Sequence, residues 1–344
     1  MEKVTRNFRG WVRDYPLESF FALAILICYA TLFPAIFLIP QDNTIGQILC
    51  YFIGQIGVFS SVISAIIITK IIQPLRTPFP LLKRLYIFFP VWIVTTIINI
   101  ANLKQTAPPQ VPLIGLVILS IPVALLPTYV ILSAFAGAES IRNLLSTLVK
   151  PKGNIVYYLI ALLTFPFIHF VGSIISNIIQ GHPLLPEINQ PSTFTYTILV
   201  AFISGLFFSG GLNEESGWRG FAQKRLQAKY SPLGSSIILW FMMVIWHIPN
   251  DLIQYQNGEY FSVRIFLYFF ITILFCWTYN RTYGSILAVA IFHASMNSMN
   301  PVMGYSPITT WGNTILIVFA TVVVVVDRMW RKLPEGYREV YIVN

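Results

Sequence analysis

A short stretch of the second half of the sequence combines two adjacent carboxylates with an arginine. Glu214 and Glu215 are neighbours, and Arg219 follows Glu215 by four residues. Adjacent carboxylates compete for protons, which prepares one of them to accept a proton from water and to return it. A helix places Glu215 beside Arg219 and turns Glu214 about 100° away. We therefore predict that Arg219 holds Glu215 while Glu214 acts on water; a solvated helix end with a salt bridge is the alternative.

Two histidines and an amide lie farther along, inside apolar segments. His247 ends one segment, and His293 precedes Asn297 by four residues, so that the latter two share a helix face. Imidazole and amide donors stabilise a developing oxyanion best where water is excluded. Two histidines with one glutamate are also a ligand set for catalytic zinc with an open water position. The residues alone therefore leave two mechanisms open: a metal-free one, and one in which Glu214, His247 and His293 bind zinc.

Helix geometry predicts that these side chains meet. Glu215 and His247 each lie sixteen residues from Ser231, at which a helical hairpin would turn. At about 1.5 Å per residue they lie about 24 Å from that turn. The basic segment 224–229 accounts for about 7 Å of this distance, which leaves about 17 Å within the apolar part of the helices. His293 lies about 18 Å from the next basic turn by the same measure. We expect three helices to bring their polar groups to one level, although a single buried histidine is more commonly a packing residue.

The composition requires that these helices lie in a membrane. Of 344 residues, 56% are hydrophobic and only 10% are charged, and the mean hydropathy is +0.70, which excludes a soluble nucleic-acid-binding protein despite a net charge of +9. Apolar stretches long enough to cross a bilayer recur along the chain. We predict an all-α, polytopic membrane bundle of about ten transmembrane helices, near 19–39, 45–69, 85–103, 113–135, 154–179, 193–212, 233–248, 265–279, 284–299 and 311–326.

Basic residues alternate between the connecting segments and predict the orientation. Of 22 Lys and Arg residues, all but Lys104 and Arg264 fall before the first span or after even-numbered spans. Cationic loops are retained in the cytoplasm, and they attract anionic lipid headgroups. We expect an integral, multi-pass protein of the cell membrane with both termini cytoplasmic. The first apolar span is too long for a signal-peptide core, so we expect it to be retained.

The domain organisation is predicted as one membrane domain over 1–344. It comprises a variable set of N-terminal helices over 1–190 without a polar site pattern, a core over 191–326 that carries the motifs, and a cytoplasmic tail over 327–344. A straight helix from Phe194 to Lys229 would be about 54 Å long, well beyond a hydrocarbon core of about 30 Å. We therefore expect a break near Gly210–Gly211.

Several other polar or reactive residues are assigned no part in the chemistry. The thiols of Cys28, Cys50 and Cys276 lie inside apolar spans, where cysteine behaves as a small hydrophobe. His169 is expected to pack in the core, and His182 to lie in a solvated loop. Asn250–Asp251, directly after the apolar span that contains His247, could orient that histidine, although such a pair more commonly caps or turns a helix.

The motif set as a whole resembles a known family. The series Glu214-Glu215-x-x-x-Arg219, His247 and His293-x-x-x-Asn297 resembles that of the CAAX-protease and bacteriocin-processing (CPBP) family. This family includes the prenyl-protein endopeptidases that act on C-terminal CAAX sequences. The resemblance covers about residues 200–300, and it departs from the family pattern at Met243, where a phenylalanine is usual.

The resemblance implies an intramembrane endopeptidase that acts on a membrane-associated or prenylated protein, or on a leader peptide. Glu214 would be the general base on water, with His247 in the same site. His293 and Asn297 would stabilise the oxyanion, and Arg219 with Glu215 would hold the carboxylates. The family is often named as metalloproteases, so the zinc question stays open. The alternatives are a proton-coupled transporter and a non-catalytic scaffold that binds a membrane partner.

Overall fold

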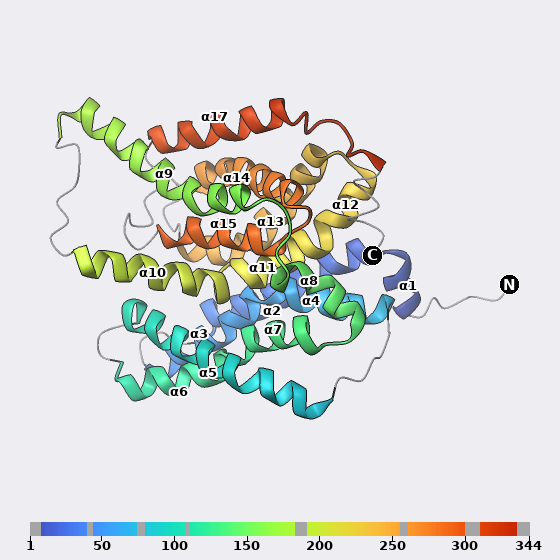
Figure 1. Cartoon of the computed structure of the whole chain (residues 1–344). Coiled ribbons are helices and arrows are strands. Elements are labelled where there is room, and N and C mark those ends of the chain that lie inside the picture. The colour runs from blue at the N-terminus through green and yellow to red at the C-terminus, as the bar shows by residue number, and fades with distance from the viewer. Residues whose placement is uncertain are drawn as a thin grey trace.

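The computed structural model is a bundle of helices, with no strand in the ranges that it describes, 8–39, 44–73, 80–107, 111–182, 191–254, 261–299 and 310–335 (Figure 1). The helices are α1 (Phe8–Asp14), α2 (Pro16–Phe37), α3 (Thr44–Val58), α4 (Ser60–Ile72), α5 (Leu81–Thr106), α6 (Leu113–Val123), α7 (Leu125–Ala136), α8 (Glu139–Val149), α9 (Ile155–Gln180), α10 (Pro191–Phe207), α11 (Gly211–Gly217), the π-helix η1 (Trp218–Gln223), α12 (Lys224–Lys229), α13 (Pro232–Gln254), α14 (Phe261–Arg281), α15 (Ile286–Ser298) and α17 (Thr310–Val326). The predicted all-α membrane fold is confirmed.

The predicted number of ten crossings is not confirmed. Within the described ranges, seven helices are long and apolar enough to cross a membrane, and an eighth results if α3 and α4 count as one span. That pair is bent by 47° at Phe59. The last two apolar stretches form the shorter helices α15 and α17. All ten predicted stretches therefore contain helix within the described ranges, with interruptions such as that at 208–210, but their lengths do not support ten equal spans.

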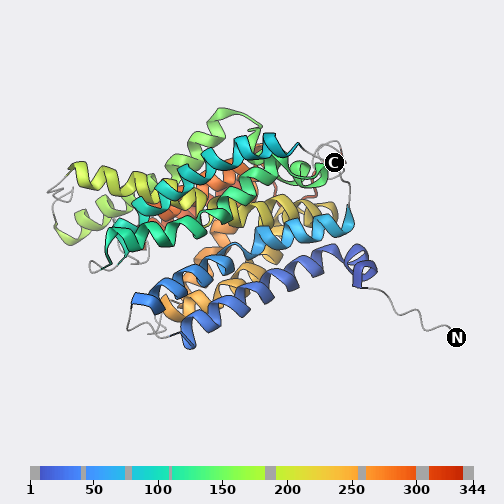
Figure 2. The ribbon, with the colours of Figure 1, turned by 90° about the horizontal axis from the view of Figure 1, so that it is seen from below.

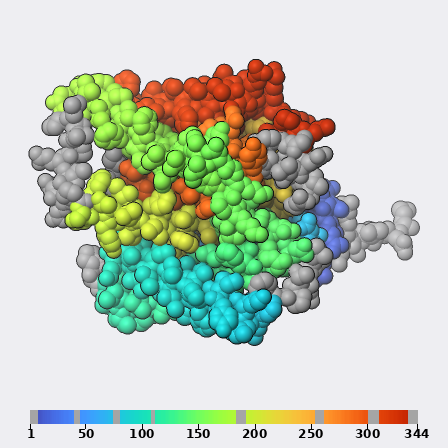
Figure 3. Space-filling view, viewed as in Figure 1, coloured from blue at the N-terminus to red at the C-terminus, as the bar shows by residue number. Residues whose placement is uncertain are grey.

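The outer surface is apolar over long stretches, as a lipid-facing surface must be. Large aliphatic side chains of α5, α9 and α17, among them Ile97, Leu163 and Val325, are more than half exposed. Figure 3 shows one such face, formed by α9, α10, α17 and the helices of the N-terminal half. Since contiguous apolar exposure of this extent is unusual for a soluble monomer, the bundle requires lipid around it.

The loops that the charge pattern assigns to one side do lie together at one end of the bundle, where Figure 1 shows α1, α8 and α12. Arg13 of α1 donates from Nε to the carbonyl of Ile71 at the end of α4, at 3.4 Å. Thr147 of α8 donates to the carbonyl of Gly284, between α14 and α15, at 2.6 Å. The backbone amide of Leu233 donates to the carbonyl of Met329, after α17, at 2.9 Å. We call this the basic end.

The N-terminal helices pack directly on the helices that carry the motifs. Phe20 of α2 stacks on Phe221 of η1 with ring centroids 5.0 Å apart, and meets Trp218 edge-on at 5.5 Å. Tyr29 of α2 donates to the carbonyl of Ile245 in α13 at 2.5 Å, and Figure 2 shows these two helices side by side. Buried aromatic pairs of this kind add stability beyond their area. The first half of the chain is therefore part of the wall around the motif residues.

Candidate active site

A break in the helical chain precedes the two glutamates. α10 ends at Phe207 and α11 begins at Gly211, so the predicted interruption is present. Gly210 has a φ of +101°, in the left-handed region that favours glycine. A Cβ at this position would also collide with the imidazole of His293. Glycine is therefore required at the break for two independent reasons, its backbone angle and its contact with the histidine.

Glu215 is the centre of a buried charged cluster. Its Oε2 lies 3.0 Å from Nε of Arg219, and its Oε1 lies 2.8 Å from Nδ1 of His293. The side chains of Glu215 and Arg219 are completely buried. The ring of Phe275 covers both partners, with its centroid 5.5 Å from Cζ of Arg219 and 5.3 Å from the His293 ring. The predicted pair of Glu215 with Arg219 is present, and it includes His293 as a third member.

The carboxylate of Glu214 forms no hydrogen bond or ion pair with this cluster, but it interacts with the cluster electrostatically. Glu214 is only 5% exposed. Its Oε2 is buried without a hydrogen-bond partner among the described residues, and the carboxylate interacts electrostatically with His293, Glu215 and Arg219. Burying a carboxylate oxygen without a donor is costly. A buried acceptor of this kind is available to a water molecule or a substrate proton.

His247 is oriented by its own helix and by two aromatic neighbours. Nδ1 lies 2.8 Å from the carbonyl oxygen of Met243, and since a carbonyl only accepts, Nδ1 must carry the proton of that bond. In a neutral ring Nε2 is then an acceptor. Trp246 meets the ring edge-on at 4.7 Å and Tyr268 packs against it at 5.1 Å. His247 and His293 interact electrostatically, which places the two imidazoles in one region.

Asn297 reaches the break before α11 rather than another motif side chain. Its Nδ2 donates to the carbonyl of Ser209 at 2.7 Å. One of the two protons of the Asn297 amide is therefore used in this bond, and the second proton can be donated to another acceptor. The residue is partly exposed, unlike His293 one turn earlier. Asn297 and His293 thus border the same break, at Ser209 and at Gly210.

Two serines of α4 support the site and were missed in the sequence. Ser61 donates from Oγ to the carbonyls of Asn213 and Glu214, at 3.0 and 3.1 Å. Ser60 accepts from Nε1 of Trp246 at 2.8 Å. Serine in an apolar helix has no distinctive spacing, so only the packing of α4 on α11 exposes this role. The sequence shows no polar site pattern over residues 1–190, and it therefore does not predict this contact of α4 with α11.

Other predicted candidates lie elsewhere. Asp251 pairs with Arg264 at 3.0 Å, and Arg264 covers the ring of Tyr268 at 4.8 Å, which in turn packs against His247. His169 is buried in α9, and His182 is exposed just after it. The thiols of the three cysteines are free.

The residues do not fit the zinc site considered from the sequence. Within the described ranges, no three His, Cys, Asp or Glu side chains are grouped closely enough to hold one metal ion. We therefore derive no step through a metal.

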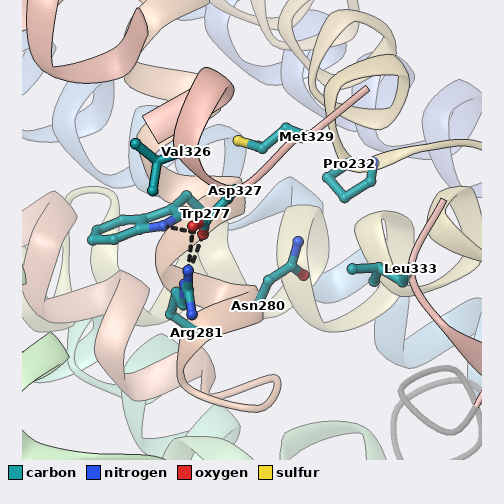
Figure 4. A pocket seen from close by; sticks show the side chains of 8 residues that line it. All are labelled: Pro232, Trp277, Asn280, Arg281, Val326, Asp327, Met329 and Leu333. Atoms are coloured by element: carbon teal, nitrogen blue, oxygen red, sulfur yellow. Dashed lines mark hydrogen bonds and ion pairs between the residues drawn. The ribbon is translucent and has the colours of Figure 1, made fainter. Parts of the chain in front are cut away.

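A pocket of about 320 Å³ lies at the basic end, between α14, the start of α13 and the segment after α17 (Figure 4). Asp327 accepts there from Nε1 of Trp277 at 2.7 Å and from Nε of Arg281 at 2.6 Å. Its lining contains none of the motif residues. These bonds tie the segment after α17 to α14, and the pocket is separate from the candidate site.

Comparisons with known proteins agree with the motif set. Residues 195–299 match the model of a protein family described as type II CAAX prenyl endopeptidase Rce1-like. CAAX prenyl protease 2 of Methanococcus maripaludis is 30% identical over 125 residues, which cover 33% of this chain and 46% of that protein. The match thus spans less than half of that relative. Both findings confirm the predicted resemblance to CPBP family proteases.

Proposed function

We propose that this protein is a CPBP-family intramembrane endopeptidase that hydrolyses a peptide bond with water activated by Glu214. The observation that carries the proposal is the buried Glu214 Oε2, which has no donor among the described residues, beside a cluster in which Glu215 is already held by Arg219 and His293. One carboxylate is thus fixed and its neighbour is available. This division of roles is what general-base catalysis by a glutamate pair requires.

The reaction proceeds in two steps. Glu214 takes a proton from water while the water oxygen bonds to the peptide carbonyl carbon, and the carbonyl π electrons move onto its oxygen. The C–N bond then breaks as that electron pair returns, and the proton on Glu214 goes to the departing amine. His247 offers the acceptor Nε2, which can hold the second water proton and so orient the attacking oxygen.

The oxyanion is the part of the transition state that needs donors. Asn297 uses one amide proton on the Ser209 carbonyl, which fixes the amide plane and aims the other proton. His293 has Nδ1 against the Glu215 carboxylate, which only accepts, so Nε2 beside Gly210 donates to the substrate oxygen when the ring is in its doubly protonated, cationic form. Preorganised donors of this kind act most strongly in a site from which water is excluded. His293 is buried, so its donor lies in such a site.

The substrate we propose is the C-terminal region of a prenylated, membrane-associated protein; a leader peptide is the second candidate. Support comes from the name of the matched family, which refers to CAAX prenyl substrates, and from a site inside apolar helices. A prenyl chain adds apolar area that keeps the peptide in the bilayer beside such a site. With the basic end in the cytoplasm, the peptide would enter from that side.

The test is a cleavage assay with purified protein in liposomes. A farnesylated CAAX peptide, the same peptide without the farnesyl group and a leader peptide are each incubated with the parent protein and with Glu214→Gln, and the products are identified by mass spectrometry. We expect cleavage of the farnesylated peptide by the parent alone. No cleavage of any peptide by a folded parent protein would contradict the proposal and favour a scaffold or transporter.

A further inference from the structure

The peptide unit between Ser209 and Gly210 is held from both sides by asparagine side chains. Its carbonyl accepts from Nδ2 of Asn297 at 2.7 Å, and its N–H donates to Oδ1 of Asn213 at 3.0 Å. The two asparagines come from different helices, α15 and α11. This peptide also contains the backbone of Gly210, which leaves no room for a side chain beside His293. Its orientation therefore fixes where Asn297 and His293 can stand.

Asn213 is itself anchored to a third helix. Its Nδ2 donates at 3.0 Å to the carbonyl of Val58, where α3 ends and the bend before α4 begins. Such a carbonyl lacks a partner within its own helix. Ser61 of α4 binds the backbone carbonyl of Asn213 at 3.0 Å. Asn213 is completely buried, so it joins the break before α4 to the break before α11 without the help of solvent.

A helix cap alone does not account for this arrangement. A side chain at the third position of a helix commonly accepts from the backbone N–H at its start, as Asn213 does for Gly210. A cap requires only an acceptor. Here the same side chain also donates to Val58, and the opposite side of the same peptide binds Asn297.

We infer that Asn213 is a positioning residue that holds the Ser209–Gly210 peptide and, through it, the Asn297 amide in place for the oxyanion. The inference rests on the proposed function for Asn297. It assigns a part in the reaction to a residue outside the Glu-Glu-x-x-x-Arg, His and His-x-x-x-Asn motifs. It also gives the break between α3 and α4, in the first half of the chain, an influence on the site.

The first test is a double-mutant cycle of Asn213→Ala with Asn297→Ala in the liposome assay. Asn213→Ala alone should lower kcat by about ten- to a hundredfold with little change in KM, since displacing a reacting group by about 1 Å can cost about 10²-fold. In the Asn297→Ala background the same change should lower kcat less than twofold, because both act through one peptide. Independent, multiplicative losses would overturn the inference.

Asn99 supplies the matched control. It is also a completely buried asparagine that joins helices, accepting from Tyr51 at 2.7 Å and donating to Ser120 at 3.2 Å. Asn99→Ala should lower thermal stability but leave kcat per folded molecule unchanged. If Asn213→Ala and Asn99→Ala lowered kcat per folded molecule equally, the role of Asn213 would be structural only.

A second variant, together with a measurement that needs no catalysis, covers the case in which the alanine variant folds poorly. Asn213→Asp keeps the acceptor for Gly210 and loses the donor to Val58, so it should retain more kcat than Asn213→Ala. Hydrogen exchange of the Gly210 amide should be faster in Asn213→Ala than in the parent, and slowed again in Asn213→Asp. An unchanged exchange rate would overturn the inference even in an active enzyme. An inactive parent with faster exchange in Asn213→Ala would instead count against the proposed function alone.

Discussion

Oε1 of Glu215 lies 2.8 Å from Nδ1 of His293, across the interface between α11 and α15. The other oxygen of the same carboxylate lies 3.0 Å from Nε of Arg219. Glu215 therefore has two partners, one beside each oxygen, while its neighbour Glu214 has a buried oxygen with no donor in the part of the chain that the structure describes. Two adjacent residues of one type thus have different environments, and the difference leads to separate predictions for each.

Glu214→Gln should abolish turnover while the protein still folds, because glutamine keeps the size of the side chain but cannot take a proton from water. The measurement is single-turnover cleavage by purified variant in liposomes, with thermal unfolding as the check on folding. Glu18→Gln, an exposed glutamate in the first turn of α2, is the matched control and should cleave at the parent rate. Near-parental cleavage by Glu214→Gln would show that another group activates water.

Glu215→Gln should destabilise the protein as well as slow it. The change leaves the fully buried Arg219 without a counter-ion, and breaking a buried pair by removing one partner costs about 3–5 kcal/mol. We expect a lower unfolding temperature than in Glu214→Gln, measured side by side in the same detergent. Equal stability of the two variants would mean that the Glu215 cluster contributes nothing to folding.

The sequence was sufficient for features that depend on spacing within one helix. Glu215 and Arg219 are four residues apart, and a helix of the predicted kind brings them together. The break at Gly210 followed from the excess length of the segment over the bilayer. Both are local consequences of helix geometry.

Contacts between helices were beyond such reasoning. Spacing predicted that His293 lies at the level of Glu215, but it could not predict that Nδ1 of His293 faces that carboxylate. Spacing also did not predict the hydrogen bond of Asn297 to the carbonyl of Ser209. The contact of Ser61 with α11 depends on how α4 packs, and the bend at Phe59 sets that packing. The count of ten spans is not confirmed for a related reason, since hydropathy identifies apolar stretches but not the bends and breaks that shorten them.

Gly210→Ala should inactivate the enzyme. A side chain at this position is strained at a φ of +101° and collides with His293. Gly54→Ala is the matched control, because a Cβ there meets only Leu32 at 3.7 Å, an ordinary contact. We expect cleavage at or near the parent rate for the control and a loss of at least about 10²-fold for Gly210→Ala, since its effect reaches an oxyanion donor. Parental activity in Gly210→Ala would contradict the tight approach of His293 to the break.

Reporter fusions test the orientation. The charge pattern predicts that the basic end, and with it the turn after Lys229, faces the cytoplasm. A reporter after Lys229 should therefore read cytoplasmic. A reporter after Glu187, which lies outside the described residues, should read external. The opposite pair of readings would reverse the predicted orientation and the proposed side of substrate entry.

Asn297→Ala should lower kcat by about 10² to 10³ with little change in KM, because an oxyanion donor acts mainly as charge develops in the transition state. Asn297→Asp should be no better. Its carboxylate would repel the oxyanion and would also face the carbonyl of Ser209, to which Asn297 now donates at 2.7 Å. Unchanged kcat in Asn297→Ala would remove this residue from the mechanism.

The same variant separates oxyanion stabilisation from a role in holding a metal. If Asn297 oriented His293 as a zinc ligand, excess zinc would restore activity to Asn297→Ala, and the metal content per chain would fall relative to the parent. Since the described residues bring no three ligands together, we expect no rescue by zinc. We also expect the parent to remain active after treatment with a chelator. Loss of parental activity on chelation, restored by zinc, would overturn the metal-free mechanism.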